Sequence, residues 1–143
     1  MKQEFVDLGL PSGTLWGKRN VYAYKRRHFT HSKAVEIARD LHCKLPSKEN
    51  FEELINLCKW KWIKLFGKVT GYKVTGPNGN YIFLPAAGSY SGVLLHDVES
   101  YGRYWSTTCF SSDIAYYLFF SNSNKNMYCY SRYCDLSIRL IKR

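Results

Sequence analysis

The sequence of 143 residues predicts one α+β domain spanning residues 1–143, with two helices beside a twisted antiparallel sheet. Helical spacing of apolar residues is confined to residues 32–58. Segments that alternate in polarity precede and follow that region. Strands grouped apart from helices favour an antiparallel α+β arrangement over alternating parallel units. We expect the N- and C-terminal strands, near 4–8 and 138–141, to lie adjacent.

The first half of the chain contains the two predicted helices. Residues 4–8 form a short predicted strand, and a turn at 10–13 separates it from an extended segment at 14–16. Ser32 is placed to cap a helix running to about residue 41. Ser47 is placed to cap a second helix, in which Glu49 favours the positive end of the helix dipole.

Beyond residue 59 the pattern predicts strands. Lysine and tryptophan alternate at 59–62, as in a half-buried strand. The Asn-Gly pair at 78–79 predicts a hairpin turn between strands at 71–75 and 81–84. Residues 89–100 are expected to form a loop. Further strands are expected at 104–107, 115–120, 127–130 and 136–141.

Tyrosine is concentrated near the C-terminus. Seven of the 12 tyrosines lie between residues 101 and 141, among Ser, Asn, Arg and Cys and without Glu or Gln. Tyr supplies contact area at low entropic cost, and Ser and Asn supply adaptable hydrogen bonds. We therefore predict a ligand-binding face at about 101–134; the alternative is an aromatic-rich sheet core. The predicted contact residues are Arg103, Cys109, Phe110, Ser112, Asn122, Asn124, Asn126, Tyr128, Tyr130, Arg132 and Tyr133.

The formal net charge of +10 allows a second interpretation, a nucleic-acid-binding domain. Basic residues cluster between Lys18 and Arg27, with Tyr22 and Tyr24 among them, which would combine phosphate contacts with base stacking. No known nucleic-acid-binding motif accompanies the cluster. A third interpretation is a structural tip subunit of a phage fibre or pilus, in which the tyrosine-rich face makes assembly contacts.

The residues indicate no enzyme, cofactor or metal. His28 and His31 are spaced as H-x-x-H, but a zinc site needs three or four converging ligands. The odd number of cysteines, five, and the absence of CxxC predict mostly free thiols. No apolar run is long enough to span a membrane, and the first residues lack an apolar signal core. We expect a cytoplasmic protein, or one carried on a phage particle or cell surface by another protein.

Three blocks, EFVDLGLPSGTLW at 4–16, LPSKENFEELINLCKWKW at 45–62 and GYKVTGPNGNYIFLPAAG at 71–88, are distinctive. With YGRYWSTT, SSDIAYYLFF and SIRLI, they resemble the Fibrobacter succinogenes major paralogous domain family, common in gut Bacteroidetes. The resemblance covers nearly the whole chain and implies a C-type lectin-like fold. It also implies kinship with variable proteins of diversity-generating retroelements, whose C-terminal strands and loops are mutated to recognise many ligands.

The chain departs from that family in two places: the segment VYAYKRRHFTH is shorter than the usual insert, and DLSIRL replaces the usual ending. The calcium motifs of sugar-binding lectins are absent, so the resemblance does not imply calcium-dependent sugar binding. Mutation of adenines in an asparagine codon yields Asn, Ser, Tyr, Cys, Arg, Asp, Phe and Ile, among others, but not Lys, Glu, Gln, Met or Trp. The first set dominates residues 101–134.

Overall fold

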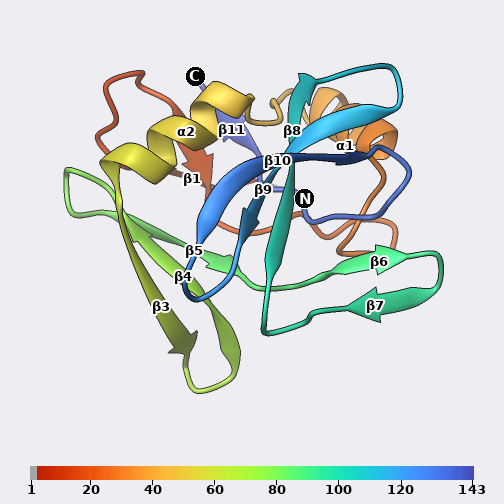
Figure 1. Ribbon diagram of the computed structural model, residues 1–143. Helices are drawn as coiled ribbons and strands as arrows, with labels where there is room; N and C mark the ends of the chain where they lie inside the picture. The colour runs from red at the N-terminus through yellow and green to blue at the C-terminus, as the bar shows by residue number, and fades with distance from the viewer. Residues whose placement is uncertain (1–2) are drawn as a thin grey trace.

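A computed structural model describes residues 3–143 and consists mainly of strands (Figure 1). Strand residues make up 44% and helical residues 14%, and the strands form four small separate sheets. The prediction of an α+β domain with a single twisted sheet was therefore wrong. Both helices are only ten residues long, and the strands divide among sheets because their partners are set by long-range packing.

The N- and C-terminal strands share one sheet but are not adjacent. The order is β1-β2-β11, so β2 separates the two strands that were expected to be neighbours. Ile141 pairs with Trp16 on one side and bridges Lys44 on the other. The strands of this sheet are β1 (Phe5–Asp7), β2 (Leu15–Gly17) and β11 (Ile141–Lys142).

Both predicted helices are present, α1 (His31–Asp40) and α2 (Lys48–Leu57). Ser47 caps α2 as predicted: its hydroxyl accepts from the Asn50 N–H, and the Asn50 side chain accepts from the Ser47 N–H. Thr30, rather than Ser32, caps α1.

The sheet formed by β3 (Lys59–Leu65), β4 (Val69–Thr75) and β5 (Tyr81–Pro85) is an antiparallel meander, in which the predicted Asn-Gly turn joins β4 to β5. A second hairpin, β6 (Ser89–Ser91) with β7 (Leu94–His96), occupies part of the predicted loop at 89–100. The third meander is β8 (Gly102–Cys109), β9 (Ile114–Phe120) and β10 (Lys125–Ser131), with β9 in the centre.

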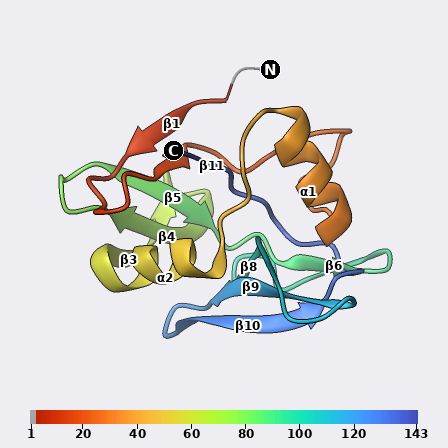
Figure 2. The same cartoon turned by 90° about the horizontal axis from the view of Figure 1, so that it is seen from above.

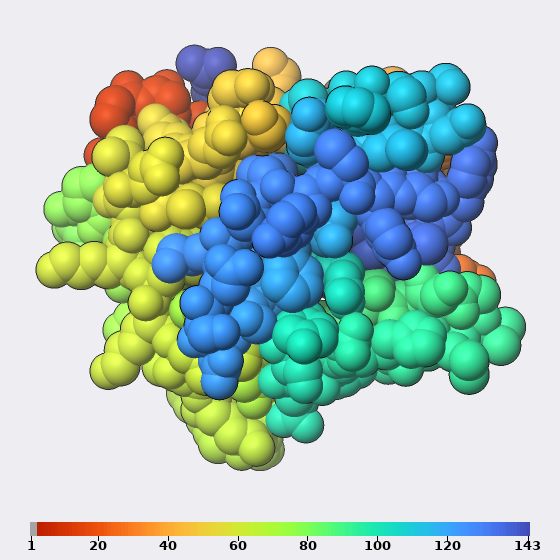
Figure 3. Space-filling view, in the orientation of Figure 1, coloured from red at the N-terminus to blue at the C-terminus, as the bar shows by residue number. Residues whose placement is uncertain are grey.

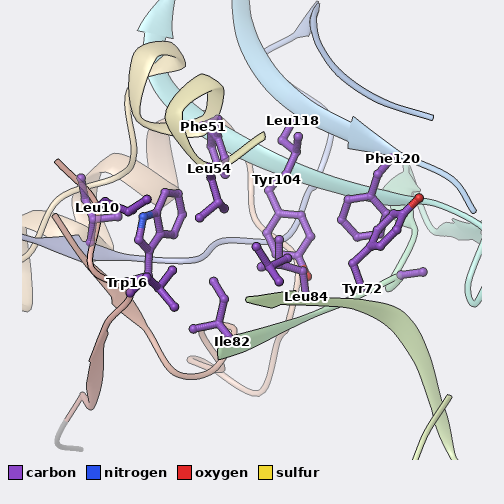
Figure 4. Packing of buried hydrophobic residues seen from close by; sticks show 14 residues of the cluster. Leu10, Trp16, Phe51, Leu54, Tyr72, Ile82, Leu84, Tyr104, Leu118 and Phe120 are labelled. Carbon is purple, nitrogen blue, oxygen red and sulfur yellow. The ribbon is translucent and has the colours of Figure 1, made fainter. Parts of the chain in front are cut away.

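Successive residues of β8 enter two different hydrophobic cores, which positions the third sheet rigidly. Tyr104 packs with Phe120 and Leu118 in a cluster that also contains Trp16 and Phe51 (Figure 4). Trp105 points the other way, into a cluster formed with α1 and residues 136–140. Successive side chains of a strand point to opposite faces of the sheet, so β8 has a packed hydrophobic cluster on each of its two faces.

Candidate ligand-binding face

Alternation along the third sheet brings predicted contact residues from different strands onto one face. Arg103 lies opposite Phe119, which lies opposite Asn126. Tyr117 lies opposite Tyr128 in the same way, and Tyr130 pairs with Ala115. Residues two apart on a strand share a face. We call this surface the tyrosine face; its residues are Tyr101, Arg103, Tyr117, Phe119, Asn126, Tyr128 and Tyr130.

The rings of the tyrosine face contact one another. Ring centroids are 5.7 Å apart for Tyr117 and Tyr130, 5.8 Å for Phe119 and Tyr128, and 5.2 Å for Tyr101 and Phe119. The planes are inclined rather than parallel, the arrangement that aromatic pairs prefer. These contacts fix the rings in place before any ligand arrives, which reduces the entropy that binding would cost.

Arg103 lies over this aromatic group. Its Cζ is 5.3 Å from the Phe119 ring centroid and 5.5 Å from that of Tyr101. Its Nη1 forms an ion pair with Asp97 at 3.1 Å, which ties the end of the β6–β7 hairpin to the sheet. In the space-filling view, β10 in blue and the hairpin in green form a continuous surface (Figure 3).

Tyr128 and Tyr130, at the centre of the tyrosine face, are partly exposed to solvent. Tyr128 is 42% exposed and Tyr130 is 41% exposed, whereas Tyr117 beneath them is buried. Part of each side chain therefore packs against neighbouring rings while the rest is accessible to solvent. A half-packed, half-exposed tyrosine is suited to act as an anchor at an interface.

A second group of predicted residues lies at the end of the sheet where β8 turns into β9. Exposed Phe110 and Ser112 belong to this turn, next to Cys109. Arg132 donates to the Ser112 carbonyl at 2.7 Å, and the Tyr133 hydroxyl donates to Asp113 Oδ1 at 3.2 Å. These bonds hold the turn against the segment that follows β10.

Asn122 and Asn124 lie apart from both groups. They form the turn between β9 and β10, at the opposite end of β9 from Phe110. Because β9 has seven residues, the two turns are separated by about 20 Å. One small ligand cannot contact both turns, although a protein partner can.

Tyr101, Tyr117, Phe119 and Asp97 belong to the site but were missed by sequence reasoning. Tyr117 and Phe119 alternate with Leu118 and Phe120, and that spacing was the available signal. Which of the two sets faces solvent depends on the strand pairing. Asp97 carried no signal, because the β6–β7 hairpin was expected to be a loop.

The pKa values of two phenols of the face, Tyr117 and Tyr130, are raised above the ordinary value for tyrosine. Burial raises the pKa of Tyr117, against the opposing effect of nearby Arg103. The neighbouring Cys134 thiol raises the pKa of Tyr130. Both hydroxyls are therefore protonated at physiological pH, and that of the half-exposed Tyr130 can donate a hydrogen bond to a ligand.

The five cysteines are free, and Cys109 and Cys129 are exposed. Within residues 3–143, His, Cys, Asp and Glu form no group of three or more that could hold a metal ion. His28 and His31 instead bond the carbonyls of Ala87 and Ser106. Neither helix in that part of the chain is long and apolar enough to cross a membrane.

The chain was compared with models of protein families, with curated proteins and with solved structures, and none of the three comparisons gave a match.

Proposed function

We propose that this protein is a non-catalytic binding protein whose tyrosine face recognises a protein or another cell-surface ligand. The single observation that carries the proposal is the convergence of Tyr128, Tyr130 and Arg103 from two strands of one sheet. Aromatic and arginine side chains carry most of the binding energy at interfaces. The opposite side of the same sheet is packed into the core, so a ligand would meet a rigid platform.

The resemblance to the Fibrobacter succinogenes major paralogous domain family adds a second element to the proposal. In variable proteins of retroelements, the C-terminal face is diversified while the scaffold is kept. Here Tyr104 and Trp105 are fully buried, whereas Phe110, Tyr128 and Tyr133 are exposed. Exchange of the exposed residues removes few core contacts, and that supports the diversification proposal.

The double variant Tyr128→Ala/Tyr130→Ala tests the binding proposal. We expect it to keep its thermal midpoint within a few degrees, because both rings are partly solvated. Tyr24→Ala is the matched control, since Tyr24 is exposed and lies outside the tyrosine face. The measurement is quantitative mass spectrometry of surface proteins from the source organism that are retained on each immobilised variant.

Support requires one or more defined proteins that wild type and Tyr24→Ala retain and the double variant loses by about tenfold or more. Equal retention by all three proteins would contradict the proposal. A collapse of the melting temperature in the double variant would instead assign Tyr128 and Tyr130 to the core.

The genomic neighbourhood tests diversification separately. A reverse transcriptase gene beside a second copy of the segment encoding residues 101–134, differing at adenine positions only, would support it. A complete source genome without such a copy would refute diversification and leave the binding proposal standing.

A further inference from the structure

Two cavities meet at residues 22–27, outside the set of residues that forms the tyrosine face. The larger, about 780 Å³, lies between β1, residues 18–22 and the outer face of β3–β5. The smaller, about 510 Å³, lies between residues 22–28 and the β6–β7 hairpin. Tyr22 and Arg27 line both cavities, so the two form one extended groove. Figure 2 shows β1 and β10 on opposite sides of the fold.

We propose that this groove binds single-stranded nucleic acid without sequence preference. The inference is independent of the proposed function, because it concerns another surface and other residues. The observations that carry it are the balance of charge, the buried arginine in the wall and the placement of exposed aromatic rings.

Cations dominate the groove. Lys18, Arg19 and Lys73 line the larger cavity, and Lys25 and Arg26 line the smaller one.

The two carboxylates that line the groove are already engaged. Glu4 pairs with Arg19 at 2.9 Å, and Asp135 pairs with Arg26 at 3.8 Å. Lys18, Lys25 and Lys73 form no ion pair among the described residues. The groove therefore retains a positive potential that attracts a polyanion.

Arg139 adds a positive charge that no carboxylate neutralises. Its side chain lines the larger cavity, yet it is only 1% exposed. Its donors reach neutral oxygens only: Asn20 Oδ1 at 2.6 and 2.9 Å, the Gly17 carbonyl at 3.0 Å and the Phe83 carbonyl at 2.6 Å. Burial lowers the pKa of Arg139 to about 10, so it stays charged at pH 7. Its field acts through a poorly solvated wall, where it is weakly screened.

Exposed aromatic rings accompany these cations. Tyr22 and Tyr81 are each 49% exposed, and Phe66 is 89% exposed at the β3–β4 turn. The Arg27 guanidinium lies 4.7 Å from the Tyr22 ring centroid, and Lys73 Nζ lies 4.3 Å from that of Tyr81. Grooves that bind single strands combine cations with aromatic rings: the cations contact the phosphates, and the bases stack on the rings.

The same features argue against a duplex and against a small anion. Bases in a duplex already stack on one another and cannot use Tyr22 or Tyr81. A small anion would use a few donors and leave most of two joined cavities empty. The floor of the larger cavity includes Ile63 and Phe83, which provide apolar contact for unstacked bases.

The test is fluorescence anisotropy with a labelled 12-nucleotide oligothymidine, measured from 50 to 300 mM salt. We expect binding that weakens linearly in log–log form as salt rises. Tyr22→Leu/Tyr81→Leu should weaken binding by about tenfold or more at each salt concentration, with the slope unchanged. Arg27→Gln/Lys73→Gln should lower the slope by about 1.4.

Lys44→Gln/Lys59→Gln removes the same charge outside the groove and should leave most of the affinity intact. Two further ligands, a 12-base-pair duplex and inorganic polyphosphate, should bind at least about fivefold more weakly than oligothymidine. Equal binding of all three ligands, or an equal loss in the control variant, would overturn the proposal in favour of diffuse charge attraction. Failure to bind oligothymidine at 50 mM salt would overturn it as well. Circular dichroism of every variant establishes that the fold is retained.

Discussion

Two histidines at the entrance to α1 are buried rather than exposed. His31 Nε2 donates to the Ser106 carbonyl at 2.8 Å, and its ring meets Trp105 edge-on with centroids 5.2 Å apart. Its Nδ1 is buried without a hydrogen-bond partner among the described residues. Burial lowers the pKa of His31 from its ordinary 6.5, and that of His28 as well. The folded protein therefore favours the neutral imidazole at both positions.

This burial predicts acid sensitivity. Below about pH 6.5 the unfolded chain takes up protons that the folded chain resists, so stability present at neutral pH falls as pH drops. Urea unfolding at pH 7.5, 6.0 and 5.0 measures the slope. His31→Gln should flatten the dependence, and the exposed His42→Gln should not. Equal slopes in the wild type and both variants would contradict a role for His31.

Residue type predicts burial well for some side chains and poorly for others. Trp16, Trp105 and Ile138 are large apolar side chains, and all three are fully buried. Trp60 and Trp62 are equally large but only partly buried, because β3 is an edge strand. Among tyrosines, Tyr104 is sealed and its hydroxyl donates to the Pro85 carbonyl, whereas Tyr128 is half-exposed. Strand register decides which tyrosines are buried and which are exposed, and register cannot be read from the amino-acid composition.

At the scale of elements, two of the three local signals were read correctly, and the third, a cap at Ser32, was wrong because Thr30 caps α1. The Asn-Gly turn and the Ser47 cap are both present. Strands whose pairing partners lie far away in the sequence were not predicted correctly. The predicted strand at 136–141 is mostly irregular: Leu136 forms a single bridge to Phe29, and regular pairing begins at Ile141. The β6–β7 hairpin was missed because Gly92 and the exposed apolar residues after it resemble a loop.

The cap of α2 gives a prediction about that helix. Ser47→Ala removes the acceptor for the Asn50 N–H and breaks the reciprocal bond, and we expect a loss of about 1 kcal/mol in the free energy of unfolding. Urea denaturation measures it. Ser32→Ala, inside α1 rather than at its cap, should change stability by less than about 0.5 kcal/mol. A larger loss for Ser32 than for Ser47 would mean that the caps are assigned wrongly.

For the whole molecule, the closing contact is β11. The Ile141 N–H donates to the Lys44 carbonyl at 2.9 Å, the Lys44 N–H donates back at 3.1 Å, and Trp16 pairs on the other side. Sequence reasoning expected terminal strands to meet, and they do share a sheet. The position of β2 between them could not be predicted, because strands of two or three residues are too short to show a periodic pattern in the sequence.

Ile141→Asp should destabilise the whole protein. It places a carboxylate at a site that is 2% exposed, and we expect a loss of at least about 3 kcal/mol. Near-ultraviolet circular dichroism and tryptophan fluorescence should report one shared unfolding transition in urea. Lys142→Asp, at the exposed neighbouring position, should have little effect. Two separate transitions would show that β11 frays without the rest.

The sheet order β1-β2-β11 also determines the orientation of the protein when it is immobilised on a surface. Since β1 and β11 flank β2, these two strands lie about 10 Å apart. Figure 2 shows β1 and β11 on the side away from β10. A tether attached through this sheet would point β10 outward and turn the larger cavity of the groove, which β1 borders, toward the support. In immobilised protein, the outward surface would be accessible to ligands, and the surface turned toward the support would be blocked.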